Sequence, residues 1–261
     1  MVGQEQSQVD DSALAKALIA PVQRAGHVIM DFYQNDRSAS AKADGSPVTK
    51  ADHAAEAILL AEIAALAPSI FIVSEENAIS HDLAANQEFF LVDPLDGTKE
   101  FIKACGDGAF TVNIGLIRNC QPVMGIVFAP ALDRLFFGSL GNGAFEISAG
   151  ICRQIHVRMP PVEGAVAVAS ASHRDEQTNQ WLEKRGITNS IAIGSSLKFC
   201  LIAAGEADLY PRYGPTMEWD TAAGDAVLRA AGGRVIAEDG KPFTYGKAGY
   251  RNQPFFAAGG G

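Results

Sequence analysis

Apolar residues in the first part of the chain recur at intervals of three and four, which places their side chains on one face of an α-helix. The run Asp10-Asp11-Ser12 can cap the start of a helix that extends to about residue 33. Proline removes a backbone donor, so we expect this helix to bend or restart at Pro21. A second apolar series predicts a helix over residues 50–66, capped by Thr49.

Short apolar runs rich in β-branched and aromatic residues follow these helices and predict strands. In the first half of the chain they lie at residues 70–73, 89–92, 109–117, 121–128, 135–138 and 144–147. Several of these runs are joined by short turns, so most of the sheet should be antiparallel. We therefore expect two helices followed by a mainly antiparallel sheet.

After the segment Met159-Pro160-Pro161, predicted strands and helices alternate, which is typical of an α/β layer. The expected strands lie at residues 165–169, 191–193, 208–210 and 234–236, and the expected helices at residues 176–185, 197–204 and 221–231. We therefore divide the chain into an N-terminal α+β half, residues 1–158, and a C-terminal α/β half, residues 159–261.

The composition is that of a globular protein, with 48% hydrophobic and 20% charged residues in a chain of 261. No apolar run is long enough to span a bilayer, and the first residues lack the basic and apolar blocks of a secretory signal. Four widely spaced cysteines form no CxxC pair, which disfavours a disulfide framework and a zinc site. We expect a cytoplasmic protein with reduced cysteines and no stable membrane insertion.

The formal net charge of −9 disfavours general binding of nucleic acids, which requires a basic surface. It does not exclude an anionic small molecule, because bound divalent cations can reverse the sign of a local site. Solubility alone also explains an acidic surface.

Two aspartates follow the apolar run at residues 89–92, in the sequence Asp93-Pro94-Leu95-Asp96-Gly97-Thr98. Pro94 fixes its own φ and Gly97 allows a sharp turn, so both carboxylates and the Leu95 carbonyl can converge on one point. Such a set of hard oxygens suits Mg²⁺ better than zinc. The following residues can open a short helix, whose first amides would face an anion beside the metal. The alternative is an Asx-rich turn in which both aspartates only cap this helix.

Other acidic residues occupy similar places in the predicted elements. Glu75 follows the strand predicted at residues 70–73, and Asp220 precedes the helix predicted from residue 221. Capping alone favours an acidic residue at a helix start, so Asp220 by itself has a simple structural explanation. Asp52 likewise lies in the first turn of a predicted helix, where caps and the helix dipole favour acids.

Three acidic segments lie far apart in the sequence. They are Ser74-Glu75-Glu76, Asp93-Pro94-Leu95-Asp96-Gly97-Thr98-Lys99-Glu100-Phe101 and Glu218-Trp219-Asp220-Thr221-Ala222-Ala223-Gly224. Their combination resembles the inositol monophosphatase superfamily, and within it most of all the 3′(2′),5′-bisphosphate nucleotidases. The resemblance covers residues 12–256 and implies a layered α-β-α-β-α fold of mixed α+β and α/β type, with an active site between the two halves.

The resemblance implies a role for each of these acidic residues. Mg²⁺ would be held by Glu75, Asp93, the Leu95 carbonyl, Asp96 and Asp220. Asp52 and Thr98 would orient and deprotonate the attacking water, and the Gly97 and Thr98 amides would hold phosphate oxygens. Glu75 and Asp220 would also face the substrate. Such an arrangement suits a phosphate monoester, an anion that metals must screen while water displaces the leaving oxygen in line.

Segments of the C-terminal half resemble the nucleotide-contacting parts of the bisphosphate nucleotidases. By this resemblance Lys198 and Arg212 would meet a second phosphate, while His173 and Ser196 would lie near the nucleoside. The alternatives are a capping or surface role for His173 and a solvated helix position for Lys198.

The resemblance implies a Mg²⁺-dependent phosphatase of sulfur assimilation, which would remove the 3′-phosphate of adenosine 3′,5′-bisphosphate and yield AMP. The rival enzymes are an inositol monophosphatase and a fructose-1,6-bisphosphatase, which would use the same metals on a sugar phosphate. The non-enzyme rival is a metal- or nucleotide-sensing regulator on the same fold. The resemblance also suggests sensitivity to lithium. The sequence leaves room for a homodimer and for weak peripheral attachment to the cytoplasmic side of the inner membrane.

Overall fold

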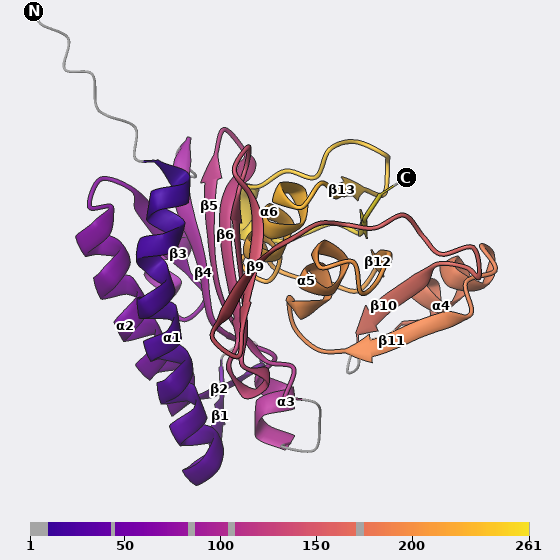
Figure 1. The fold of residues 1–261 in the computed structure, drawn as a ribbon. Helices are drawn as coiled ribbons and strands as arrows, with labels where there is room; N and C mark the ends of the chain where they lie inside the picture. Colours follow the sequence, from indigo (N-terminus) through magenta and orange to yellow (C-terminus); the bar gives the residue numbers. More distant parts are fainter. Residues whose placement is uncertain (1–9, 43–44, 83–86, 104–107, 171–174, 261) are drawn as a thin grey trace, which may run out of the picture.

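The computed structural model describes residues 10–42, 45–82, 87–103, 108–170 and 175–260. Within these residues the strands form sheets of seven, five and two strands, which we call the larger, the smaller and the two-stranded sheet. Figure 1 shows α1 (Asp11–Asn35) and α2 (Lys50–Leu66) on one side of the larger sheet. On its other side lie α5 (Leu197–Ala203) and α6 (Ala222–Ala230), with the smaller sheet beyond them. The chain therefore folds as alternating helical and sheet layers.

The outer layer of α1 and α2 follows the predicted pattern closely. Asp10 caps α1 by accepting a 3.0 Å hydrogen bond from the Ser12 amide, and Thr49 caps α2 in a capping box with Asp52. Helix α1 runs without interruption past Pro21, so the expected restart is wrong. Buried apolar side chains on both sides of the proline pack this helix against the larger sheet, which outweighs the lost hydrogen bond.

The larger sheet carries two of the three acidic segments, and its strand order is β3-β4-β5-β6-β7-β8-β9. Its strands are β3 (Phe71–Ser74), β4 (Glu88–Asp96), β5 (Thr111–Arg118), β6 (Gln121–Ala129), β7 (Arg134–Ser139), β8 (Gly143–Ser148) and β9 (Ile151–Ile155). β3 pairs with β4 in parallel and every later pair is antiparallel, as the hairpin pattern predicts. The sequence pattern does not predict β9, because this edge strand is mostly exposed and lacks a buried apolar series.

Helix α6 lies close to the larger sheet because three glycines face it. Gly115, Gly125 and Gly138 are direct partners across β5, β6 and β7, so they form a row without side chains. A Cβ atom added at Gly125 would lie 2.2 Å from the Ala223 carbonyl oxygen of α6. The row therefore sets the depth at which α6 packs, and with it the place of Asp220, two residues before that helix.

The smaller sheet belongs to the C-terminal half, and its strand order is β11-β10-β12-β14-β13. Its strands are β10 (Val166–Ser170), β11 (Asn189–Ile193), β12 (Leu209–Arg212), β13 (Arg234–Ala237) and β14 (Phe255–Ala258). β10 pairs in parallel with β11 and β12, as an α/β layer predicts, and β14 pairs antiparallel with β12 and β13. The sequence pattern does not predict β14, a four-residue strand in which two alanines follow the two aromatic residues.

Adjacent residues of β14 show that helices cover both faces of the smaller sheet. Phe255 stacks on Phe199 of α5 with ring centroids 5.7 Å apart, and Phe256 stacks on Trp181 of α4 (Glu176–Glu183) at 5.1 Å. Successive side chains of a strand point to opposite faces, so α4 and α5 lie on opposite sides of this sheet. The predicted α-β-α-β-α layering is thereby confirmed.

The remaining elements are short. They are β1 (Ala39–Ala41), β2 (Pro47–Thr49), α3 (Thr98–Lys103) and the 3₁₀ helices η1 (Ala78–Asp82), η2 (Pro130–Leu132) and η3 (Ala248–Tyr250). The larger sheet ends at Ile155 and the smaller sheet begins at Val166, so the predicted boundary at residues 158 and 159 falls between the sheets. The division of the chain into two halves at that point stays a prediction.

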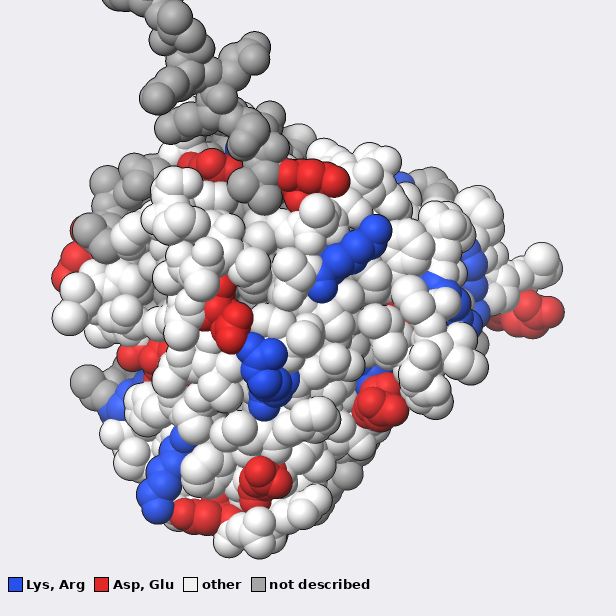
Figure 2. Space-filling view, turned by 60° about the vertical axis from the view of Figure 1, so that its left-hand side comes forward, with Lys and Arg blue, Asp and Glu red and all other residues white. Residues whose placement is uncertain are grey.

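The surface in Figure 2 carries acidic and basic side chains scattered among uncharged ones. This face shows no broad basic patch, in keeping with a net charge of −9. Within the described ranges, no helix combines the length and the apolar character that a membrane span requires.

Replacement of Gly125 by alanine should destabilise the protein, because the new methyl group would collide with the backbone of α6. The obstructing atom is a main-chain oxygen, which no side-chain rotation can move away. We expect the free energy of unfolding to fall by about 2 kcal/mol or more. Urea denaturation followed by circular dichroism measures this change, and an unchanged midpoint would contradict the close approach of α6 to β6.

Candidate active site

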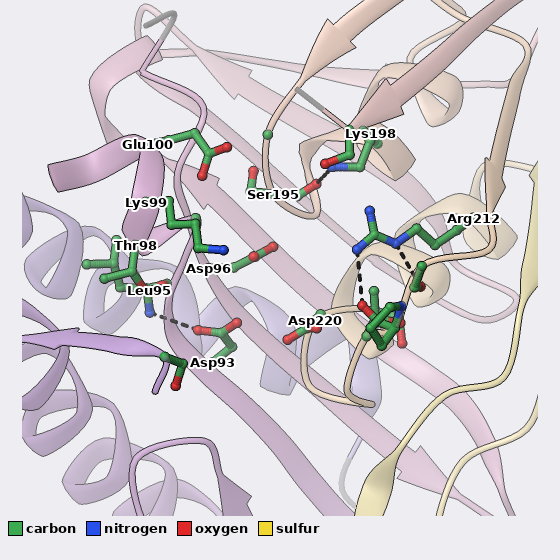
Figure 3. A pocket seen from close by; sticks show the side chains of 18 of the residues that line it. Asp93, Leu95, Asp96, Thr98, Lys99, Glu100, Ser195, Lys198, Arg212 and Asp220 are labelled. Atoms are coloured by element: carbon green, nitrogen blue, oxygen red, sulfur yellow. Dashed lines mark hydrogen bonds between the residues drawn. The ribbon is translucent and has the colours of Figure 1, made fainter. Parts of the chain in front are cut away.

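A cavity of about 590 Å³ lies beside the ends of β3 and β4, and residues from both halves of the chain line it. Figure 3 shows Asp93, Asp96 and Asp220 around one central space, with Lys198 and Arg212 on the wall that the C-terminal half supplies. Acidic and basic side chains therefore face one another across a single cavity.

Asp93 and Asp96 both line the cavity because strand β4 is irregular between them. Asp93 pairs with Asn113 of β5 and Asp96 with Thr111, so three steps along β4 oppose two steps along β5. Residues three apart in a regular strand would point to opposite faces, and this bulge removes that alternation. The Leu95 amide also donates a 3.0 Å hydrogen bond to the Asp93 carboxylate, which fixes its direction.

Three acidic residues from separate segments meet at the bulge. Glu75, Asp93 and Asp220 each place one carboxylate oxygen within 4.8 Å of the others. Asp93 is 1% exposed, and its Oδ2 atom is buried without a hydrogen-bond partner. Such an oxygen is costly unless a cation or a proton satisfies it. The three residues therefore form a set of hard oxygen ligands that fits a divalent metal ion.

Asp96 and Leu95 lie beside this acidic cluster and also line the cavity. One carboxylate oxygen of Asp96 accepts a 2.5 Å hydrogen bond from the Ser196 amide, while the Leu95 carbonyl accepts one from the Thr98 hydroxyl at 3.2 Å. Gly97 has a φ of +93°, which favours glycine, and its turn leads directly into α3. The parts predicted for Asp96 and the Leu95 carbonyl in metal binding stay predictions.

Burial and mutual repulsion disturb the ionisation of the acidic cluster. Burial raises the pKa of Asp93 well above its ordinary value, and the charges of Glu75, Asp96 and Asp220 raise it further. Burial likewise raises the pKa of Asp220, and it raises the pKa of Asp96 to about 6. Ionising these carboxylates without a counter-ion therefore costs folding free energy, which a bound cation would restore.

Lys42 compensates part of this negative charge. Its Nζ atom lies 2.7 Å from a carboxylate oxygen of Glu75 and 2.6 Å from one of Glu76. Burial raises the pKa of Glu76 to about 7 in spite of this contact. The polar sequence around Lys42 does not indicate a site residue. Lys42 follows the short strand β1, and only the tertiary structure brings it beside Glu75.

Asp52 and Thr98 are held by different partners. The Asp52 carboxylate accepts hydrogen bonds from the Thr49 amide at 2.8 Å and the Thr49 hydroxyl at 2.6 Å, and burial raises its pKa. The Thr98 hydroxyl donates to the Leu95 carbonyl, and no hydrogen bond links it to Asp52 in the part of the chain that the structure describes. The capping role of Asp52 is thus visible, whereas the roles of both residues toward water stay predictions.

Lys198 forms part of the basic wall of the cavity, in the first turn of α5. It is only 4% exposed, so the alternative of a solvated helix position is wrong. Its Nζ atom donates to the carbonyl oxygens of Ile193, at 3.3 Å, and of Ser195. Burial lowers the pKa of Lys198 to about 8, although the Asp96 carboxylate opposes this effect. The backbone therefore holds a buried amine at the cavity wall.

Arg212, at the end of β12, is fixed in a similar way. Its Nε and Nη2 atoms donate to the carbonyl oxygens of Gly214 and Pro215 at 3.0 and 3.1 Å. Both Lys198 and Arg212 are thus oriented by main-chain acceptors rather than by carboxylates, so their positive charges remain available to an anion in the cavity.

Ser196 lies behind the lining of the cavity. Its hydroxyl bonds the side chains of Asn113 and Thr111 on β5 at 2.5 and 2.9 Å, and the residue is 2% exposed. Its amide supports Asp96, as described above. A contact between Ser196 and a nucleoside stays a prediction that this placement does not support. His173 lies outside the described residues, so its predicted contact is also untested.

The cavity includes residues that the sequence interpretation did not assign to the site. They are Ser46, Pro47, Lys99, Glu100, Asp175, Phe199, Gly214, Pro215, Thr216 and Thr221. Ser170, Gly194, Ser195 and Tyr210, which also line it, lie in the C-terminal segments whose resemblance predicts nucleotide contacts. Lys99 and Glu100 lie within the acidic segment and follow Thr98 directly, so their place in the sequence could have indicated them. Asp175 caps α4 with one oxygen, and its Oδ2 atom is buried without a hydrogen-bond partner. Its sequence position indicates only the capping role.

Replacement of Asp93 by asparagine should stabilise the metal-free protein. The Asp93 carboxyl keeps its proton up to a higher pH in the folded state than in the unfolded chain. Its ionisation therefore lowers the stability of the folded state as the pH rises above 3.8, the ordinary pKa of an aspartate. Asparagine keeps an acceptor for the Leu95 amide and removes the charge. We expect a higher Tm for Asp93→Asn at pH 7.5 with EDTA. The Tm should rise by about 2–4 °C for each kcal/mol gained in the free energy of unfolding.

Thermal unfolding at pH 5 and pH 7.5 measures this effect. The advantage of the asparagine variant should shrink at pH 5, where the parent carboxyl is more fully protonated. Added Mg²⁺ should raise the Tm of the parent protein more than that of Asp93→Asn. A variant that is less stable than the parent in EDTA at pH 7.5 would contradict the repulsion described above.

Comparisons with known proteins find relatives that are similar over most of this chain. The 3′(2′),5′-bisphosphate nucleotidase CysQ of Escherichia coli K12 is 44% identical over 226 residues, which are 85% of this chain and 89% of that protein. The protein of the same name from Buchnera aphidicola is 40% identical over 240 residues, or 90% of this chain and 89% of that protein. The similarity therefore extends over most of both chains.

Solved structures show the same fold. The crystal structure of CysQ from Bacteroides thetaiotaomicron has a TM-score of 0.82 and 35% identity, and covers 97% of this chain and 99% of that one. An inositol monophosphatase from Anabaena has a TM-score of 0.74 and 27% identity, with 95% and 91% covered. The sequence model of the inositol monophosphatase family matches residues 10–255 of this chain. The chain therefore belongs to the inositol monophosphatase family and is close to the CysQ proteins within it.

Proposed function

We propose that this protein is a Mg²⁺-dependent phosphatase that hydrolyses the 3′-phosphate of adenosine 3′,5′-bisphosphate and yields AMP and phosphate. The observation that carries this proposal is the cavity in which a partly buried acidic cluster faces the cations of Lys198 and Arg212. The names of the similar CysQ proteins support the same substrate class. A substrate with two phosphates would use both sides of such a cavity.

The acidic side of the cavity would hold the metal. Glu75, Asp93 and Asp220 would be ligands, joined by Asp96 and the Leu95 carbonyl. When bound, Mg²⁺ supplies a Lewis acid that lowers the pKa of water and screens the charge of the phosphate.

The protein itself would position the reacting groups. The amides of Gly97 and Thr98 would hold oxygens of the 3′-phosphate, since they follow the turn beside the acidic cluster. The Thr98 hydroxyl would orient the attacking water, and the Asp52 carboxylate would accept its proton; a carboxyl with a raised pKa is suited to that acceptance. Water oxygen bonds to phosphorus, the bond to the ribose 3′-oxygen breaks, and that oxygen gains a proton.

The basic side would hold the 5′-phosphate. Two of the three donors of the Lys198 ammonium group are used by backbone carbonyls, which leaves one for a phosphate oxygen. Arg212 likewise keeps guanidinium donors beyond its two backbone contacts. Holding these cations in advance reduces the conformational entropy lost when the substrate binds.

Sugar phosphates are the competing substrates, because the solved structures of the same fold include inositol monophosphatases. The experiment that tests the proposal measures phosphate release from adenosine 3′,5′-bisphosphate, inositol 1-phosphate and fructose 1,6-bisphosphate with added Mg²⁺. We expect kcat/KM to be highest for the nucleotide and AMP to be the product. Faster hydrolysis of a sugar phosphate, or release of adenosine 3′-phosphate, would overturn the assignment.

The wider properties implied by the resemblance also belong to this proposal. They are a place in sulfur assimilation, a cytoplasmic location, sensitivity to lithium, a homodimer and peripheral attachment to the inner membrane. Phosphate release in the presence of lithium tests one of them directly. A regulator that senses metal or nucleotide would bind adenosine 3′,5′-bisphosphate without releasing phosphate, so the same assay separates it from the enzyme.

Replacement of Lys198 by methionine should weaken activity selectively. Methionine fills a similar volume without the charge, so the contact with the second phosphate is lost while the packing of α5 is largely kept. A charge-assisted hydrogen bond contributes about 1.5–3 kcal/mol, so kcat/KM for adenosine 3′,5′-bisphosphate should fall roughly tenfold to a hundredfold. Activity on inositol 1-phosphate, which has no second phosphate, should change little.

Lys184→Met is a matched control, since Lys184 is exposed and does not line the cavity. An equal loss on both substrates would mean that Lys198 acts through the fold or the acidic cluster. Unchanged activity on both would mean that the second phosphate is recognised elsewhere.

Replacement of Thr98 by alanine should lower kcat on the order of 10²-fold and leave KM nearly unchanged, because a group that orients the nucleophile acts mainly in the transition state. Thr98→Ser, which keeps the hydroxyl, is the control and should retain most activity. Steady-state kinetics at saturating Mg²⁺ measures both constants. A large rise in KM with intact kcat would make Thr98 a substrate-binding residue.

A further inference from the structure

His81 lies in the 3₁₀ helix η1, in the connection that follows Glu75. Its Nε2 atom is 2.8 Å from the carbonyl oxygen of Ser74. A carbonyl oxygen can only accept a hydrogen bond, so Nε2 carries the proton and donates it. Ser74 is the residue directly before Glu75, and the imidazole therefore holds the backbone at the start of the segment that carries this carboxylate.

The other side of the imidazole contacts the C-terminal half of the chain. The ring of His81 stacks on Trp219 with a centroid distance of 4.7 Å and an interplanar angle of 22°. It also lies 6.4 Å from the ring of Tyr250, which in turn lies 6.1 Å from Trp219. Trp219 directly precedes Asp220. One side chain thus contacts the residue before Glu75 and the residue before Asp220.

These two carboxylates need such a link because they repel each other. Glu75 and Asp220 come from different halves of the chain, and their oxygens approach within the 4.8 Å of the acidic cluster. Without a restraint, this repulsion would favour separation of the segments that carry Glu75 and Asp220.

We infer that His81 is a positioning residue that holds the Glu75 and Asp220 segments at the spacing a divalent cation requires, through its hydrogen bond to Ser74 and its stacking on Trp219. This inference rests on the proposed metal site. Partners behind metal ligands typically contribute roughly ten- to hundredfold to metal affinity.

The Asp220 segment has a second anchor, so removal of His81 should not unfold it. The Glu218 carboxylate accepts hydrogen bonds from the Gly246 and Lys247 amides at 2.7 and 3.0 Å. The Glu218 amide donates to the Tyr250 carbonyl at 2.8 Å. The segment can therefore stay folded without His81 while its distance from Glu75 becomes less defined.

The test separates the two contacts of His81 by substitution. His81→Phe keeps a ring for stacking on Trp219 and removes the hydrogen bond, whereas His81→Gln keeps a donor and removes the ring. His81→Ala removes both. Ile79→Ala is the control, because Ile79 lies in the same 3₁₀ helix and is 81% exposed. Isothermal titration calorimetry with Mg²⁺ alone measures the affinity, and urea denaturation measures the stability of each variant.

We expect the Kd for Mg²⁺ to rise roughly tenfold in His81→Ala and by less in His81→Phe and His81→Gln. The Mg²⁺ concentration that gives half-maximal phosphate release should rise in parallel, and higher Mg²⁺ should restore turnover. A Kd in His81→Ala equal to that of the Ile79→Ala control would overturn the inference. The inference would also fail if the loss of Mg²⁺ affinity in the three His81 variants simply followed their loss of stability, since that pattern indicates packing alone. If the parent protein itself does not bind Mg²⁺, the proposed metal site fails, and the inference fails with it.

Discussion

Three carboxylates, one buried and two partly buried, lie close together, and their mutual repulsion is the constraint on which the rest of the site depends. Asp93 has one oxygen without a partner, while Glu75 and Asp220 approach it from different segments. The surrounding structure works against their separation. The Leu95 amide fixes the direction of the Asp93 carboxylate, Lys42 neutralises part of the charge, and Glu218 fixes the segment that carries Asp220.

The opposite wall holds buried cations, Lys198 and Arg212, with which no carboxylate of the described residues forms an ion pair. Backbone carbonyls accept hydrogen bonds from Lys198 and Arg212, so these side chains are oriented but not neutralised. An ion pair would satisfy them more completely and would leave them less available to a ligand. The cavity thus separates charge of opposite sign, which is a natural arrangement for a ligand that bridges a metal and a second anionic group.

Most of the fold was accessible from the sequence because its longer elements have clear periodicity. Helices α1 and α2 and the strands of the larger sheet up to β8 follow the apolar pattern, whereas β9 and β14 are too exposed or too short to show it. That Asp93 and Asp96 line the same cavity could be expected from the sequence, because Pro94 and Gly97 indicate an irregular backbone beside them. The contacts of Lys42 and His81 were not, since each depends on where the folded chain brings another segment.

The row of glycines across β5, β6 and β7 links packing to chemistry over a distance. Because α6 rests in this row, its depth sets the position of Asp220 relative to the carboxylates on the larger sheet. A side chain introduced along the row would shift α6, and Asp220 with it, without touching the cavity. The positions least tolerant of substitution should therefore include these glycines. They lie on the larger sheet away from the cavity, so the list of cavity-lining residues does not contain them.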